Sequence, residues 1–428
     1  MIDTTAMGAY QLGDLTPTRI EQPAGCDELV AFLRQATRDG LAVVPWGGGT
    51  RQHIGNPPAR YDVVLRTSGL NRIIEHTPAD LTVTVETGTC LGDVQAALAE
   101  HGQWLPWDPP QSAKATIGGL LASGAVGSLR LGYGPPRDWT LGMRVVLGDG
   151  RLVRSGSKVV KNVAGYDSHK LHLGALGTLG VIAEITFKVA PLPPCRATLL
   201  ASFTAPRAVM NALAQLREAP LQPIALTALN AVAEQAMPAL HNFIADQPVH
   251  VVVAARFAGS PAAVERQLRA AAARCVEVGA RTIDLNEHDD TPLWAAIADF
   301  NAPFDPNEII LRAGVPPTSI SDLARLLEHV PPRHGWRSAR MLLPGIGIGM
   351  ARWHIPASMS TDLGAVFAEL RASLAEYGGY VVAEHVPPQW RDHLDAWGSP
   401  PPTVSLMQSL RSRWDPAGII NPGRYLIP

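Results

Sequence analysis

Three consecutive glycines, at 47–49, stand out as residues that could do chemistry. They follow a short apolar run and precede Thr50 and Arg51. Without side chains, the backbone can curl so that successive N–H groups point into one concavity, a nest suited to a phosphate. For an isolated glycine run, a surface turn is the alternative interpretation. Two further glycine-rich stretches, at 115–128 and 174–182, favour the nest, because together they suggest a long diphosphate ligand lying against the backbone.

The order of these glycines does not match the usual nucleotide-binding fingerprints. A Rossmann unit needs G-x-G-x-x-G directly after a strand and opening a helix. The glycines at 174–182 lead into a predicted strand, and the run at 47–51 is followed by His53 and prolines rather than by an amphipathic helix. The sequence contains no G-x-x-x-x-G-K-[ST], so a P-loop site is unsupported.

The first part of the chain, to residue 194, is predicted to alternate short strands with helices. A hairpin turn is expected at Asp149-Gly150, between two apolar runs. The prolines at 191, 193 and 194 give the first domain boundary. Apolar patterning predicts a helix at 91–102 and strands at 41–45, 62–66, 81–88 and 181–189.

From residue 195, alanine-rich helices alternate with strands, although no sequence repeat is visible. Such strand–helix–strand units predict an α+β or α/β sandwich, in which helices cover one face of a sheet. A proline-rich break at 398–403 precedes a final helix and the tail DPAGIINPGRYLIP, which needs somewhere to dock. We therefore predict domains at 1–194 and 195–398 and a C-terminal segment at 399–428.

Length and composition indicate a globular chain with a balanced charge. With 428 residues, 46% hydrophobic and 17% charged, the chain can bury a core over about two to three domains. Lysine and arginine number 36 against 38 aspartate and glutamate, which argues against nucleic acid or an anionic membrane as the main partner. Neither a signal peptide nor a membrane span is visible, so we expect a cytoplasmic protein whose membrane contact comes only through partners.

Seven motifs, in order along the chain, resemble the FAD-binding fold of the vanillyl-alcohol oxidase and p-cresol methylhydroxylase (PCMH) superfamily. Within it, the chain resembles the FAD-binding subunits of bacterial glycolate oxidases, well over residues 20–194 and the last 25 or so, and only by type in between. The resemblance implies an α+β fold with a two-lobed PCMH-type FAD-binding domain, an α/β cap and a tail that packs back on the first domain. The motifs are PWGGGTR (45–51), VETG (85–88), TIGGLLASG (116–124), GYGPPRDW (132–139), KNVAGYD (161–167), GTLGVI (177–182) and DPAGIINPGR (415–424).

The resemblance also implies which residues hold the FAD. The loop at 47–51 would bind the diphosphate, residues of 116–123 would lie along the ribityl chain and flavin, and residues of 177–182 would wrap the adenosine side. Lys161, Asn162, Tyr166 and Asp167 would sit near the flavin ring or support it. The full expected set is Trp46, Gly47, Gly48, Gly49, Thr50, Arg51, Thr116, Gly118, Gly119, Ser123, Gly177, Thr178, Gly180, Val181, Ile182, Asn421 and Arg424.

Covalent attachment of the flavin is the alternative that His53 raises. Parts of the superfamily bind flavin covalently through a histidine in or near the diphosphate loop. His53 lies beyond the glycine run, and related subunits hold FAD non-covalently. We therefore expect non-covalent FAD, with His53 as a polar loop residue.

In such an enzyme the protein must bind the substrate's carboxylate and take up the hydroxyl proton, for which an arginine fork and a histidine base are suited. The cap offers Arg352 and His354, which alternate onto one strand face, and His385. A solvated strand face and a loop position are the structural alternatives. The larger sister flavin subunit of such complexes carries a histidine arrangement for metal and substrate in its cap. No His-x-His occurs here, and we predict no metal site.

Three functions stay open at this stage. In the favoured one, the chain is one of two flavin subunits of a glycolate-oxidising complex that passes electrons through an iron–sulfur subunit to quinone. The four scattered cysteines suit a reducing compartment and cannot ligate a cluster alone, which agrees with a cluster-bearing partner. The second is a self-sufficient FAD oxidase or dehydrogenase for a hydroxy acid or alcohol, and the third a subunit whose FAD is structural.

Overall fold

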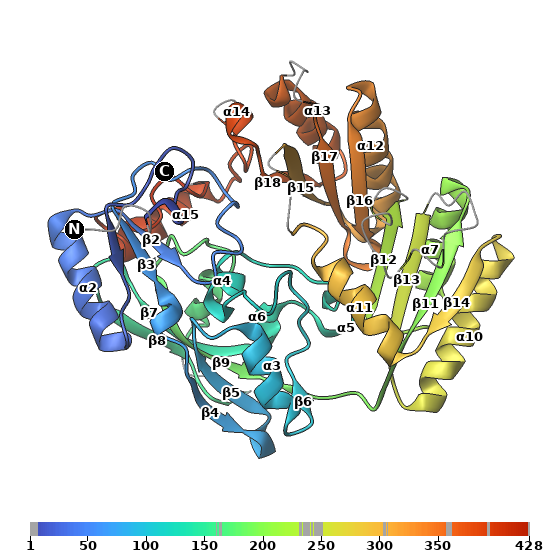
Figure 1. The fold of residues 1–428 in the computed structure, drawn as a ribbon, viewed down its shortest axis with the longest axis horizontal. Coiled ribbons are helices and arrows are strands. Elements are labelled where there is room, and N and C mark those ends of the chain that lie inside the picture. The colour runs from blue at the N-terminus through green and yellow to red at the C-terminus, as the bar shows by residue number, and fades with distance from the viewer. Residues whose placement is uncertain are drawn as a thin grey trace. The chain divides into compact units, whose positions relative to one another are not determined.

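A computed structural model describes residues 7–159, 161, 165–230, 233, 240, 243, 251–302, 305, 307–356, 362–391 and 394–426 (Figure 1). The chain divides into two compact units, which we call unit 1 and unit 2. Unit 1 comprises Met1–Ala125, Pro135–Leu192 and Ser399–Pro428, and unit 2 comprises Val126–Gly134 and Pro193–Gly398. The chain therefore passes between the units four times, and its last residues belong to the same unit as its first.

Unit 1 begins with a small parallel sheet covered by one helix. In spatial order its strands are β1 (Arg19–Glu21), β3 (Val63–Arg66) and β2 (Val43–Trp46). Helix α2 (Cys26–Asp39) connects β1 to β2 and packs its apolar face on this sheet. Gly40 ends the helix at φ 65°, a left-handed conformation that favours glycine. The glycine loop follows β2, whose first two residues, Val43 and Val44, are fully buried.

A five-stranded antiparallel sheet forms the rest of the framework of unit 1. Its order is β4 (Ile73–Thr77), β5 (Thr82–Glu86), β9 (Val181–Lys188), β7 (Thr140–Val146) and β8 (Leu152–Gly156). These bounds confirm the predicted strands and the Asp149-Gly150 hairpin, in which Gly150 has a φ of 76°. The smaller elements of unit 1 are α3 (Leu91–Ala99), β6 (Gln103–Trp104), α4 (Ile117–Ala122), α6 (Pro136–Trp139), β10 (Ala190–Pro191) and α15 (Val404–Trp414).

Alternation along β5 and β9 decides which face of this sheet is the core. Val85 and Ile185 pair directly and are fully buried with the apolar sides of α3 and α4. The neighbouring pair on the same two strands, Thr84 and Thr186, faces the other side of the sheet, and their hydroxyl groups hydrogen-bond to each other at 2.9 Å. The period of two in the sequence therefore places α4, with its glycines, against a rigid sheet.

Unit 2 is built on one eight-stranded antiparallel sheet, in the order β14-β11-β13-β12-β16-β17-β15-β18. Each half of this sheet is a β-α-β-β-α-β motif, and the halves meet where β12 pairs with β16. The first half is β11 (Cys195–Phe203), α7 (Pro206–Glu218), β12 (Ala225–Asn230), β13 (Val251–Gly259), α10 (Pro261–Glu277) and β14 (Arg281–Leu285). The second half is β15 (Glu308–Gly314), α12 (Ile320–Arg333), β16 (Arg337–Leu343), β17 (Ile348–His354), α13 (Leu363–Ala375) and β18 (Tyr380–His385). Among the described residues, this unit also contains the α-helices α5 (Arg130–Tyr133), α11 (Glu287–Ala298) and α14 (Pro388–Arg391).

The duplication is structural and was not visible as a sequence repeat. The third strand of each half nevertheless carries Ala-Arg-aromatic, as Ala255-Arg256-Phe257 and as Ala351-Arg352-Trp353. Both aromatic side chains are fully buried in the core that α7, α10, α12 and α13 form on one face of the sheet. Alternation along the strands directs Arg256 and Arg352 to the opposite face. The predicted sandwich, with helices on one face of a sheet, is confirmed.

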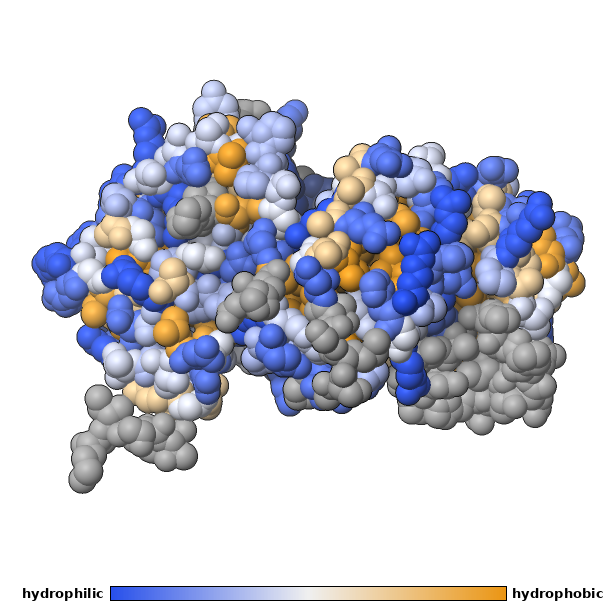
Figure 2. Space-filling model, turned by 90° about the horizontal axis from the view of Figure 1, so that it is seen from above, coloured by the Kyte–Doolittle hydropathy of each residue, from blue (hydrophilic) through white to orange (hydrophobic). Residues whose placement is uncertain are grey.

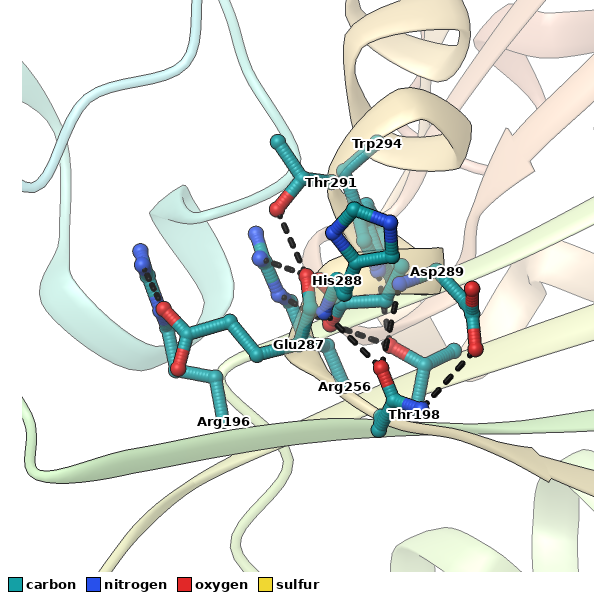
Figure 3. Close-up of polar contacts among 10 residues, drawn as sticks. Arg196, Thr198, Arg256, Glu287, His288, Asp289, Thr291 and Trp294 are labelled. Carbon is teal, nitrogen blue, oxygen red and sulfur yellow. Dashed lines mark hydrogen bonds and ion pairs between the residues drawn. The ribbon is translucent and has the colours of Figure 1, made fainter.

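Arg256 is held by a buried polar cluster beneath α11 (Figure 3). Its guanidinium donates two hydrogen bonds to the Asp290 carboxylate, at 2.8 and 2.9 Å, and Asp290 is completely buried. Thr198 also donates to Asp290, at 3.0 Å, and Trp294 donates to Thr198, at 2.8 Å. The cluster therefore ties α11 to β11 and β13 in the absence of bulk water.

Two surface properties complete the description. None of the helices in the described part of the chain combines the length and the hydropathy of a membrane-spanning helix. Hydrophilic residues dominate the face drawn in Figure 2, and the hydrophobic ones lie between them in small groups.

We predict that Asp290→Ala lowers the free energy of unfolding of unit 2 by about 3–5 kcal/mol, because it leaves a buried guanidinium without its carboxylate. Chemical denaturation followed by tryptophan fluorescence and circular dichroism measures this. The exposed neighbour Asp289 provides the control, and Asp289→Ala should cost less than about 1 kcal/mol. Equal losses in the two variants would contradict a structural role for the buried pair.

Candidate functional site

A cavity of about 740 Å³, including the space at its mouth, opens in unit 1 where three backbone segments converge. They are the loop after β2, the start of α4 and the loop before β9, and the C-terminal tail adds two residues. The lining residues are Pro45, Trp46, Gly47, Gly48, Gly49, Thr50, Arg51, Gln52, Thr67, Thr87, Thr116, Gly118, Gly119, Ala122, Ser123, Leu176, Gly177, Gly180, Val181, Ile182, Asn421 and Arg424.

All the residues expected to hold FAD line this cavity except Thr178. That residue is buried, and its hydroxyl donates to the Ala175 carbonyl at 2.7 Å within the loop before β9. The structure adds lining residues that sequence reasoning missed, among them Gln52, Thr67 and Leu176. Thr87 could have been found, because it lies in the VETG motif, whereas Thr67 carries no local signal.

The glycines of the first loop are required by the close approach of protein to protein. A Cβ atom on Gly47 would lie 2.1 Å from the Thr116 hydroxyl oxygen, and one on Gly48 would lie 2.0 Å from the Lys114 carbonyl oxygen. Gly49 has a φ of 71°, which side chains rarely tolerate. The absent side chains let the loop and the start of α4 touch, and this contact forms one wall of the cavity.

The polar groups of the cavity suit an anionic ligand. Arg51 and Arg424 line it together with threonine and serine hydroxyls, and the described lining residues include no aspartate or glutamate. Asn421 presents a buried amide oxygen for which the described residues provide no hydrogen-bond donor. The positive charge of the two guanidiniums fits the diphosphate of FAD, and the Asn421 amide oxygen fits a polar donor of the cofactor.

Other residues singled out in the sequence lie elsewhere. His53 is half-buried in the loop after the glycines and does not line the cavity. Neither Tyr166 nor Asp167 lines the cavity. The Tyr166 side chain is 95% exposed, and Asp167 forms an ion pair with Lys170. Lys161 is exposed, and Asn162 lies outside the described residues.

In unit 2, the sheet face opposite the core helices carries the three residues proposed for catalysis. Arg352 and His354 lie on the same face of β17, as predicted, and both are half-buried. Ile310 of β15 pairs with Arg352 on one side and with His385 on the other. Because one strand lies between them, the Cα atoms of Arg352 and His385 are about 10 Å apart. The sheet thus gathers the candidates into one region.

Arg352 already has partners within unit 2, and His385 is buried. Arg352 donates to the Glu308 carboxylate, at 2.5 and 3.0 Å, and to the Phe300 carbonyl at 3.2 Å. Burial, with a smaller contribution from Arg391, lowers the pKa of His385 to about 4, so its imidazole is neutral at physiological pH. Roles in catalysis for Arg352, His354 and His385 stay predictions.

A second buried histidine supports the cavity. His172 stacks on Trp414, with ring centroids 4.9 Å apart, just before the loop that contains Gly177. Burial lowers the pKa of His172 to about 4, with a smaller effect of His169. The neutral ring therefore links the end of α15 to the wall of the site.

We predict that Gly48→Ala weakens FAD binding at least about tenfold, since the methyl group meets a backbone carbonyl that cannot turn away. Flavin fluorescence titration of the apoprotein measures the dissociation constant. The matched control is Gly25→Ala, because a Cβ at Gly25 meets nothing within 4 Å. Unchanged affinity in Gly48→Ala would show that the loop can open without loss of the site.

The stability of the protein should also fall as the pH is lowered. The unfolded chain takes up a proton at His172 with the ordinary pKa of 6.5, whereas the folded protein does so only near 4. Protonation of the unfolded chain therefore lowers the free energy of unfolding by about 2 kcal/mol between about pH 7 and about pH 5. Above about pH 7 His172 has no further effect on it. Urea unfolding at both pH values should show that His172→Phe loses that much less stability than the wild type. The exposed His101 is the control, and His101→Phe should keep the wild-type dependence.

Comparison with known proteins agrees with this geometry. A model of FAD-binding domains matches residues 17–156, and one of the C-terminal domain of FAD-linked oxidases matches residues 192–425. The chain is 30% identical over 432 residues to a D-2-hydroxyglutarate dehydrogenase of Xanthomonas citri pv. viticola, with 95% of this chain and 89% of the relative covered. It is 25% identical over 422 residues to glycolate oxidase subunit GlcD of Bacillus subtilis, with 95% and 88% covered.

A shorter match is closer in sequence. Glycolate oxidase subunit GlcE of Escherichia coli is 36% identical over 208 residues, which cover 48% of this chain and 58% of the relative. Among solved structures, an alkyldihydroxyacetonephosphate synthase superposes with a TM-score of 0.71 at 17% identity, covering 94% of this chain and 75% of that one. This likeness shows the PCMH-type fold. The chain belongs to the family of FAD-linked oxidases and is an FAD-dependent oxidoreductase of the glycolate oxidase and D-2-hydroxyglutarate dehydrogenase type.

Proposed function

We propose that the protein is an FAD-binding subunit of a glycolate oxidase complex, which oxidises glycolate to glyoxylate. The observation that carries the proposal is the similarity to both GlcD and GlcE, two subunits named for the same oxidase. The dehydrogenases among the relatives act on D-2-hydroxyglutarate or D-lactate. These names share the 2-hydroxy acid as the substrate class, and glycolate is its smallest member.

The first task of the chain is to hold the cofactor non-covalently. The N–H groups of the glycine loop and the Arg51 guanidinium would bind the diphosphate, and the Asn421 amide oxygen would accept a hydrogen bond from the cofactor. His53 does not line the cavity, which supports non-covalent attachment. When bound, FAD accepts the hydride that leaves the substrate carbon.

The second task is to bind the hydroxy acid and remove its hydroxyl proton. Arg352 would bind the carboxylate by its guanidinium fork, in competition with Glu308, which now occupies it. His385, neutral at physiological pH, is a candidate to take the proton, and His354 on the face of Arg352 is the other. Loss of one hydride and one proton converts the alcohol to the carbonyl of glyoxylate.

Electron transfer beyond the flavin requires a partner in this proposal. The four cysteines stay unpaired thiols, and no group of three or more metal-binding side chains occurs among the described residues. An iron–sulfur subunit would carry the electrons to quinone, and a second flavin subunit would complete the complex. The other candidate functions are a self-sufficient hydroxy-acid or alcohol dehydrogenase, which the full-length similarity to D-2-hydroxyglutarate dehydrogenases favours, and a subunit with structural FAD.

The test is anaerobic addition of glycolate to the FAD-loaded protein while the visible absorption of the flavin is followed. We expect bleaching with glycolate, in the presence of the partner subunits if not with the chain alone, and slower bleaching with D-2-hydroxyglutarate and D-lactate. Bleaching of the isolated chain by another hydroxy acid in preference to glycolate would overturn the substrate. Flavin that stays oxidised in the assembled, active complex would favour the structural alternative.

A further inference from the structure

The tail of the chain contacts the small parallel sheet of unit 1 through one isolated parallel β-bridge, between Val43 of β2 and Ile420. The Val43 N–H donates to the Ile419 carbonyl at 2.8 Å, and the Asn421 N–H donates to the Val43 carbonyl at 2.9 Å. The Asp415 carboxylate accepts from the N–H groups of Ile419 and Ile420, at 3.1 and 2.9 Å. Both isoleucines are fully buried. The tail is thus fixed directly beside the strand from which the glycine loop leaves.

Arg424 carries this attachment into the loop itself. Its guanidinium donates to the Gln52 side-chain oxygen at 2.6 Å, and to the carbonyl oxygens of Gln52 and Ile54 at 2.7 Å each. The Gln52 amide in turn donates to the Pro45 carbonyl at 2.9 Å, which closes the loop on its own beginning. Arg424 is 4% exposed, so these bonds form away from bulk water. A residue near the end of the chain therefore holds the shape of the loop after β2.

Asn421 makes the corresponding contact on the other side of the cavity. Its side-chain N–H donates to the Leu176 carbonyl at 2.6 Å, next to Gly177 in the loop before β9. Its backbone adopts a φ of 45°, in the left-handed region that asparagine tolerates better than most other non-glycine residues. The tail thus contacts both glycine loops that border the cavity.

We propose that residues 415–424 act as a clasp that completes the FAD site, with Arg424 as a positioning residue that shapes the diphosphate loop. Docking of the clasp and binding of FAD are then linked: FAD stabilises the docked tail, and the docked tail raises the affinity for FAD by the same factor. Arg424 acts through its planar fork, because three separate oxygens, two of them backbone carbonyls, receive its N–H groups. The inference rests on FAD binding and not on the identity of the substrate.

The affinity of the apoprotein for FAD, measured by fluorescence titration, tests the role of Arg424. We expect both Arg424→Ala and Arg424→Lys to weaken binding at least about tenfold, since a single ammonium cannot serve three buried acceptors. The control is Arg413→Ala, an exposed arginine just before the tail, which should bind FAD as the wild type does. Wild-type affinity in Arg424→Lys would overturn positioning in favour of charge alone, and wild-type affinity in Arg424→Ala would overturn any role.

Gln52→Met tests the same contact from the side of the loop, should Arg424→Ala fail to fold. It removes the bonds of Gln52 to the guanidinium and to the Pro45 carbonyl, and should weaken FAD binding at least about threefold. Unchanged affinity in this variant would contradict the clasp.

Hydrogen exchange measures the linkage directly. Saturating FAD should slow exchange of the Val43 and Asn421 amides, which join the tail to β2, at least about tenfold in the wild type. In Arg424→Lys this protection should be largely lost. Equal exchange with and without FAD in the wild type would overturn the coupling. Failure of glycolate to bleach the flavin would leave both readouts unaffected, so the two proposals fail separately.

Discussion

The FAD site depends on one steric constraint: the loop after β2 must touch the backbone that leads into α4. Gly47 and Gly48 allow this, because any Cβ there would overlap Thr116 or the Lys114 carbonyl. Close approach turns the loop and the start of α4 into one continuous wall of the cavity. The glycines therefore serve the architecture of the protein first, and through it the diphosphate of the cofactor.

The cavity of unit 1 is built from segments that lie far apart in the chain. The walls of the cavity come from residues near 50, 120 and 180 and from the last residues of the chain, which follow the whole of unit 2. Loops of this kind have few apolar contacts of their own, so buried polar bonds must fix them. Arg424 and Asn421 supply such bonds, and the stack of His172 on Trp414 adds an apolar one. A cofactor site made from distant segments thus gains rigidity from the end of the chain.

Unit 2 shows how one sheet can carry two environments. The two halves place Arg256 and Arg352 at the same position, on the face opposite the core helices. Helix α11 contributes the buried Asp290 to the first arginine, which becomes a structural ion pair. The second arginine, paired with the half-buried Glu308, retains partial access to solvent. The duplication therefore offers one arginine for stability and leaves the other near groups that could act on a substrate.

Much of this protein could be read from local patterns. The glycine runs, the alternation of β5 and β9 and the hairpin at Gly150 follow from short-range backbone preferences and side-chain periodicity, which a sequence displays directly. The stretches expected to hold FAD came from the resemblance of seven motifs to a known family. Tertiary structure alone placed Thr67 and Gln52 in the cavity, aimed Arg424 at loop carbonyls, paired Arg352 with Glu308 and revealed the duplicated sheet. The reason is physical: these features depend on contacts between residues far apart in the chain, and the geometry of such contacts is set by packing of whole elements rather than by any local preference.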